Sequence, residues 1–161
     1  MLEVTLGPGL LSSVYDGLQN NLTTMESVFL KRGEYTDPLD HKKLWDFTPI
    51  AKEGDKVTAA DWLGEVKEGW LPHKIMVPFS FKGEYTVKKI AEAGKYNIDM
   101  VVAVLTGADG EETYVTMTQK WPVKVAVKAY QEKPRPQKIM ETGVRCIDTF
   151  NPIAEGGTGF I

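Results

Sequence analysis

The sequence predicts a mainly β fold, with a small β domain, a short N-terminal helix and extended flanking tails. From about residue 45 to about 117, strand-like segments alternate with glycine or proline turns roughly every eight to twelve residues, the spacing of a sandwich or barrel. Asp109-Gly110 lies between two such segments and is a strong hairpin signal. The chain has 161 residues, 42% hydrophobic and 25% charged, which is enough for one globular domain with its own core.

The first predicted element is a short amphipathic helix. Gly7-Pro8-Gly9 forms a turn, and five apolar residues follow at helical spacing: Leu10, Leu11, Val14, Tyr15 and Leu18. Residues 26–33 are expected to be extended and to end in a turn. A helical turn near Pro38 then leads into the first strand of the domain.

The predicted strands of the β domain follow from β-branched and aromatic runs bounded by turn residues. They cover residues 44–50, 62–68, 73–78, 83–91, 96–105 and 111–119. Gly54-Asp55 and Asp109-Gly110 are expected to form turns, and the second and third strands form a hairpin with Trp70 near its tip. We expect Trp70 to cover an edge of the core, or alternatively to be an exposed aromatic that binds a partner.

The predicted core combines inward-facing residues of these strands with tryptophans at its edges. The expected core residues are Trp62, Val66, Ile75, Val77, Val87, Ile90, Val102, Val104 and Val115. Trp45, Trp70 and Trp121 are expected to cover the edges.

The C-terminal part departs from this rhythm. The proline-containing stretch "KPRP" at residues 133–136 favours an extended connector. A helical or extended piece, a glycine turn and the start of a strand follow, and the last residues are expected to be disordered. The predicted divisions are residues 1–27 (helix and connector), 28–118 (β domain), 119–143 (connector) and 144–161 (start of a further domain).

Charge and hydropathy exclude two classes of partner. The net charge is −3 and the basic residues are scattered, so nucleic acid is not expected. The longest apolar run, Met100 to Leu105, is far shorter than the roughly 20 residues of a membrane-spanning helix. These features predict a soluble, intracellular protein without membrane insertion.

No residue pattern predicts a catalytic, cofactor-binding or metal site. His41 and His73 lie far apart with no other metal-ligating residue type at ligand spacing, which favours structural histidines. Cys146 is the single cysteine and is interpreted as a small buried residue. The glycine run at residues 156–159 lacks the lysine and hydroxyl of a phosphate-binding loop, so we interpret it as part of a flexible tail.

The central region resembles the lipoyl and biotinyl carrier domains, which have the barrel-sandwich hybrid fold. The shared features are glycine-led strands, the "GD" turn and "VP" after the central hairpin. In those carriers a modified lysine occupies the hairpin tip. Here the tip reads "KEGWLPHK", and Lys74 lies too far along the next strand. The resemblance therefore implies the fold without the carrier chemistry.

The chain as a whole resembles the catalytic A subunit of V-type and archaeal A-type rotary ATPases. The motifs "LGPGLL", "YDG", "GDKV", "HKIMVP", "KWPV", "TGVRCIDTF" and "GGT" occur in the family's order. In that family "GGT" and its strand lead into the phosphate loop, which would follow Ile161. The resemblance therefore implies a segment that spans the subunit's non-homologous, or bulge, region and ends just before the phosphate loop.

The resemblance implies that the segment is a structural and regulatory module of an ion-transporting ATPase. The parent enzyme would make or hydrolyse ATP. The implied partners are the B subunit and the peripheral stalk, at the cytoplasmic face of the membrane. MgATP or MgADP would bind elsewhere in the parent subunit, and the segment alone is expected to be inactive because the phosphate loop is missing. The alternative is a free-standing β-barrel carrier-like or protein-interaction domain without catalysis.

Overall fold

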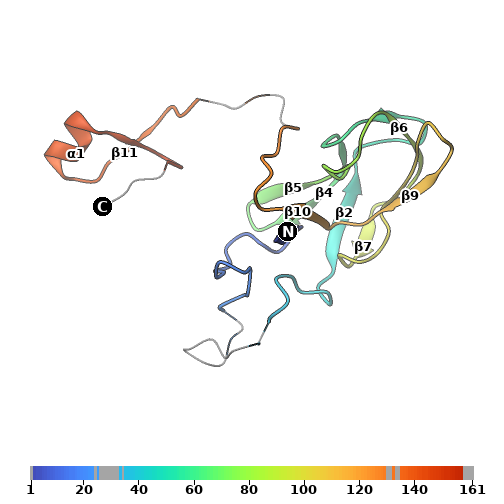
Figure 1. Cartoon of the computed structure of the whole chain (residues 1–161), viewed down its shortest axis with the longest axis horizontal. Coiled ribbons are helices and arrows are strands. Elements are labelled where there is room, and N and C mark those ends of the chain that lie inside the picture. Colours follow the sequence, from blue (N-terminus) through green and yellow to red (C-terminus); the bar gives the residue numbers. More distant parts are fainter. Residues whose placement is uncertain are drawn as a thin grey trace. The chain divides into compact units, whose positions relative to one another are not determined.

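The structure is a computed structural model, and it falls into two units, residues 1–129 and 130–161, which are described separately (Figure 1). The described residues are 2–23, 25, 33, 35–129, 132 and 135–157. Residues 26–32 of the predicted extended piece, residues 133–134 of the "KPRP" stretch and the last four residues of the expected disordered tail lie outside the described residues.

Two antiparallel four-stranded sheets build the first unit, in the orders β5-β4-β2-β7 and β3-β6-β8-β9 (Figure 1). Their strands are β2 (Trp45–Pro49), β3 (Lys56–Val57), β4 (Trp62–Glu68), β5 (Leu71–Met76), β6 (Tyr85–Ile90), β7 (Gly94–Tyr96), β8 (Ala103–Thr106) and β9 (Glu112–Val115). The prediction of a mainly β fold is confirmed, as are the hairpins between β4 and β5 and between β8 and β9.

A third pairing joins the start of the unit to its end. β1 (Glu3–Leu6) runs antiparallel to β10 (Gln119–Pro122), with Glu3 opposite Pro122 and Leu6 opposite Gln119. The side-chain amide of Gln19 lies beside β1, where it accepts the Thr5 N–H at 2.7 Å and donates to the Thr5 carbonyl at 2.6 Å. Gln19 therefore satisfies backbone groups that an edge strand leaves unpaired.

The core consists of two clusters of buried apolar side chains. The first contains Leu39, Trp45, Phe47, Val66, Ile75, Ile98, Val102 and Met117. The second contains Ala51, Val57, Leu63, Val77, Val87, Ala103, Leu105 and Val115. Ile90 is partly buried and packs against both clusters, so the two parts of the core share a contact.

The predicted N-terminal helix is wrong. Turns occupy the segment, and Ser12 and Gln19 have positive φ angles of 64° and 67°. Asp16 supplies the reason, because its Oδ1 accepts the N–H groups of Leu18 and Asn20 at 2.9 and 2.8 Å. Such local side-chain to backbone bonds compete with helical ones. They also hold the pKa of Asp16 below its usual value, with the Asn20 side-chain hydrogen bond as the largest cause.

The structure reverses the predicted positions of Trp62, expected in the core, and Trp45, expected at its edge. Trp62 is 54% exposed, whereas Trp45 is 4% exposed and belongs to the core. The register of β4 against β5 shifts between Trp62 and Gly64, which is a β-bulge. Because a bulge changes which residues face inward, Leu63 is buried and Trp62 faces solvent. The other edge tryptophan, Trp121, is partly buried.

The single strand predicted for residues 96–105 is in fact two strands. A turn after Tyr96 ends β7, and Asn97 Oδ1 accepts the N–H groups of Asp99 and Met100 at 3.1 and 3.0 Å. β8 begins at Ala103. An asparagine that bonds the backbone two residues on is typical of a turn.

The second unit is small, with a short ribbon of β11 (Ile139–Met140) and β12 (Ile153–Ala154) and the helix α1 (Arg145–Phe150) between them. Thr142 donates through its N–H and hydroxyl to Asp148, and these bonds hold the pKa of Asp148 below its usual value. Cys146 is exposed on α1, so its predicted burial is wrong.

Candidate interaction surface

The hairpin of β4 and β5 presents an exposed aromatic side chain at its tip. Glu68 pairs with Leu71, so Gly69 and Trp70 form a two-residue turn. Gly69 has a φ of 61°, in keeping with the Gly-X sequence of a type II′ turn. Trp70 is 87% exposed, and of the two predicted roles for it, the covering of a core edge is therefore wrong.

Glu68 fastens this hairpin to the N-terminal segment. Its Oε1 accepts the N–H groups of Gly9 and Leu11 at 2.6 and 3.0 Å, and its Oε2 lies 2.6 Å from His73 Nδ1. Glu68 is 7% exposed, so these contacts satisfy a buried carboxylate. The hairpin tip therefore projects from an anchored base.

The outer face of the same hairpin is mixed in character. Lys74 pairs with Glu65 on the opposite strand, and its Nζ lies 4.9 Å from the centroid of the Trp62 ring. Lys74 thus lies within a strand and not at the tip, as expected from the sequence. Trp62 pairs with Met76 at the end of the hairpin away from Trp70, so the two exposed tryptophans lie at opposite ends of it.

A groove of about 310 Å³ lies between the N-terminal segment and β5. Its lining includes Leu11, Leu71, Ile75 and Met117, and Leu11 is 46% exposed. The groove is therefore largely apolar and adjoins the hairpin. Together with Trp70 it forms the candidate interaction surface.

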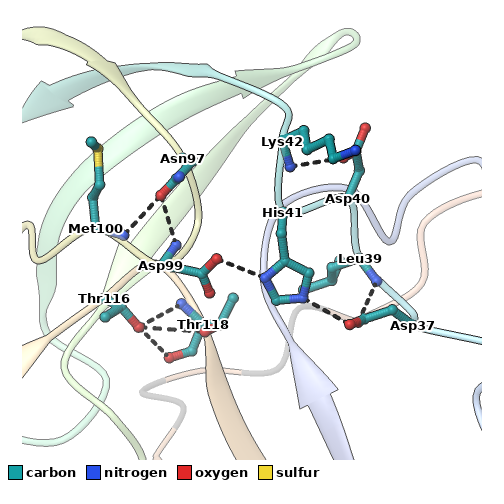
Figure 2. A network of polar contacts seen from close by, with 10 residues as sticks. All are labelled: Asp37, Leu39, Asp40, His41, Lys42, Asn97, Asp99, Met100, Thr116 and Thr118. Atoms are coloured by element: carbon teal, nitrogen blue, oxygen red, sulfur yellow. Dashed lines mark hydrogen bonds and ion pairs between the residues drawn. The ribbon is translucent and has the colours of Figure 1, made fainter.

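A separate polar cluster surrounds the other histidine of the chain, His41. His41 Nδ1 lies 2.7 Å from Asp99 Oδ2, and His41 Nε2 lies 2.9 Å from Asp37 Oδ2 (Figure 2). The hydrogen bond to Asp99 raises the pKa of His41, with smaller contributions from the charges of Asp37 and Asp99. His73 in turn bonds Glu68, so both histidines are hydrogen-bonded in the structure.

Sequence reasoning missed Glu68 and the carboxylate partners of His41. A signal for Glu68 was present, because strand alternation places it on the same face as the buried Val66. The pairing of His41 with Asp99 joins positions 58 residues apart, and local patterns carry no information about such a contact. Asp37 lies four residues before His41, a weaker local signal.

The described residues contain neither a metal-binding cluster nor a membrane-spanning helix. No group of three or more histidine, cysteine, aspartate or glutamate side chains is arranged to hold a metal ion in that part of the chain. Among the same residues, no helix has the length and apolar character needed to cross a membrane.

Comparison with known proteins identifies relatives of the whole chain. It is 47% identical to the V-type ATP synthase alpha chain of Borrelia turicatae over 161 residues, 98% of this chain and 28% of that protein. The corresponding proteins of Treponema denticola and Chlamydia abortus are 46% and 48% identical, and the chain covers 27% of each. The chain therefore spans little more than a quarter of the length of these relatives, and the resemblance to the V-type ATPase subunit is confirmed.

The family model for the ATP synthase alpha/beta subunit barrel-sandwich domain matches residues 36–124. This range contains all eight strands of the two four-stranded sheets, and it covers more than half of the chain. The barrel-sandwich fold expected from the sequence is thereby confirmed. The chain belongs to the family of ATP synthase alpha/beta subunit barrel-sandwich domains.

Proposed function

We propose that the chain is a structural and regulatory docking module within the alpha (A) subunit of an ion-transporting rotary ATPase. In this proposal the β4–β5 hairpin contacts a neighbouring B subunit or a peripheral stalk subunit at the cytoplasmic face of the membrane. The exposed Trp70 on an anchored hairpin carries the proposal. The relatives named V-type ATP synthase alpha chain support the choice of parent complex.

Trp70 has the properties of a binding hot spot. Tryptophan is enriched among the few interface residues that carry most of the binding energy, because it offers a large apolar area with few rotatable bonds. An exposed fraction of 87% leaves nearly all of this area available. A solvated indole gains free energy when a partner covers it, so the tip favours association.

The support beneath Trp70 reduces the entropy that binding costs. The turn at Gly69 and the bonds of Glu68 to Gly9 and Leu11 fix the hairpin base before any partner arrives. Preorganised elements bind more tightly because less freedom is lost on association. The adjoining apolar groove offers room for a partner side chain.

In this proposal the module itself does not bind or hydrolyse ATP. MgATP or MgADP binds to another part of the parent subunit, and the module transmits or resists torque through its contacts. A free-standing interaction domain without catalysis is the second candidate, and the same hairpin would be its binding element.

The Trp70→Ala variant tests the proposed contact. We expect it to weaken binding of the chain to the B subunit or to the peripheral stalk subunits at least tenfold, because about 1.4 kcal/mol or more of binding energy is lost with the indole. Biolayer interferometry with each purified partner measures the two affinities separately.

The Tyr114→Ala variant is the matched control, since Tyr114 is also an exposed aromatic, at 64%, but lies on β9 outside the hairpin. It is expected to bind as the unchanged chain does. Equal affinity of Trp70→Ala and the unchanged chain for both partners would contradict the proposal. Binding to an unrelated protein, with none to either ATPase partner, would favour the free-standing domain.

A further inference from the structure

His41 is held between two carboxylates from different segments of the chain (Figure 2). Asp37 belongs to the segment that precedes β2, and Asp99 belongs to the loop between β7 and β8. Their Oδ2 atoms lie 2.9 and 2.7 Å from the two ring nitrogens. These are hydrogen-bond distances at both ends of one imidazole.

Proton counting shows that both contacts require the charged ring. A neutral imidazole has one N–H donor and one lone pair, whereas an ionised carboxylate only accepts hydrogen bonds. Two carboxylates can therefore both accept from His41 only when each ring nitrogen carries a hydrogen. Loss of one proton turns one of the two contacts into a repulsion between lone pairs.

Each of the two aspartates makes one further local hydrogen bond. The Asp99 N–H donates to Asn97 Oδ1 at 3.1 Å in the turn that follows β7. Asp37 Oδ1 lies 3.4 Å from the Leu39 N–H, while its Oδ2 faces His41. The ring therefore joins two segments whose contact residues are 58 positions apart in the sequence.

The contact lies over part of the first core cluster. Leu39, between Asp37 and His41, is 5% exposed, and Ile98, next to Asp99, is fully buried. Both belong to the cluster that contains Trp45. Opening of the polar contact would therefore remove one link to the segment that carries Leu39, which the burial of Leu39 and the bond from the Tyr15 hydroxyl to the Pro38 carbonyl still hold.

We propose that His41, Asp37 and Asp99 form a proton-dependent clasp that fastens the segment before β2 to the β7–β8 loop. The clasp is closed while the ring carries two protons and loosens when it loses one. This inference does not depend on the proposed docking function.

The charges around the ring favour the closed form. On its own segment His41 has Asp37, Asp40, Lys42 and Lys43 as charged neighbours, and Asp99 faces it from the β7–β8 loop. Lys43 is directed over the Trp45 ring, with its Nζ 4.0 Å from the centroid. Figure 2 also labels Asn97, Thr116 and Thr118, and none of these three residues carries a charge.

The direction of the pH dependence follows from the raised pKa of His41 in the folded chain. A raised folded-state pKa adds stability that is fully present below the unfolded value of about 6.5. That stability is lost as the pH rises through the folded-state pKa. The clasp is therefore closed at mildly acidic pH and opens at alkaline pH.

Proton NMR titration of the two imidazoles tests the clasp directly, because the chain contains only His41 and His73. We expect the His41 midpoint to lie above about 6.5 in the unchanged chain and to fall toward that value in Asp99→Asn and in Asp37→Asn.

Thermal unfolding of His41→Gln supplies the second readout, since glutamine cannot gain the proton. We expect the unchanged chain to melt above this variant at a pH of about 5.5 and to lose that advantage by a pH of about 9. A melting difference equal at both pH values would overturn the proposal. A His41 midpoint that is the same in Asp99→Asn as in the unchanged chain would overturn it as well.

Discussion

Substitution of Gly64 by alanine is expected to lower the free energy of unfolding by about 3 kcal/mol, because the added methyl group has no space. A Cβ at this position would overlap the Phe47 ring and lie 2.8 Å from the Thr48 carbonyl oxygen. Phe47 is 1% exposed in the first core cluster, so the ring has no free volume to enter. Thermal unfolding measures the effect, with an expected fall in melting temperature of about 10 °C for a domain of this size.

Gly17→Ala is the matched control for this experiment. A Cβ at Gly17 meets no atom within 4 Å, and Gly17 is not among the glycines with positive φ. Its effect on stability is expected to stay within about 0.5 kcal/mol. Similar melting temperatures for the two variants would show that β2 and β4 can move apart, contrary to the close packing described here.

Replacement of Glu68 by alanine is expected to cost about 2 to 3 kcal/mol of stability, since it leaves partly buried donors without an acceptor. The N–H groups of Gly9 and Leu11 and the ring of His73 all lose their partner. Urea unfolding measures the loss. Hydrogen exchange locates it, because the amides of Gly9 and Leu11 are expected to lose protection.

Glu65→Ala provides the comparison on the same strand. Glu65 pairs with Lys74 at a position where its side chain is 36% exposed, and such pairs contribute roughly 1 kcal/mol or less. If Glu68→Ala were no less stable than Glu65→Ala, the carboxylate would not anchor the N-terminal segment. Unchanged exchange at Gly9 and Leu11 would lead to the same conclusion.

The sequence predicted the β domain well because its signals are local. The Asp109-Gly110 turn fixes the hairpin of β8 and β9, where Gly110 has a φ of 77°. Period-two alternation in β4 and β5 correctly placed Val66 and Ile75 in the core. Turn residues and hydrophobic alternation each involve only a few neighbouring residues, so both can be recognised from the sequence before the fold is known.

The errors arose where a side chain overrode a local pattern. Helical spacing of leucines predicted a helix around Val14, but Asp16 binds backbone groups that the helix would need. The bulge at Trp62 reversed the inward and outward positions at the start of β4. The residue types around this bulge do not reveal it, so alternation alone predicted that Trp62 is in the core, although it is exposed.

The candidate site was predictable in part. The sequence predicted that Trp70 covers a core edge and gave an exposed, partner-binding role as the alternative, and Trp70 is exposed. The contacts beneath it were not predictable, because Glu68 reaches Gly9 across 59 positions of sequence. Which distant residues meet is decided by the register of whole sheets and not by any short motif.

The pairing of β1 with β10 has a mechanical consequence. Glu3 lies opposite Pro122 at one end of the ribbon, and the Val123 N–H donates to the Leu2 carbonyl beyond it at 3.0 Å. A force that pulls these neighbouring ends apart acts along the interstrand hydrogen bonds, which lie perpendicular to the strands, so the bonds break one after another. Under tension the β1–β10 pair would therefore separate before force reaches the two four-stranded sheets. Both core clusters would stay packed while the pair opens.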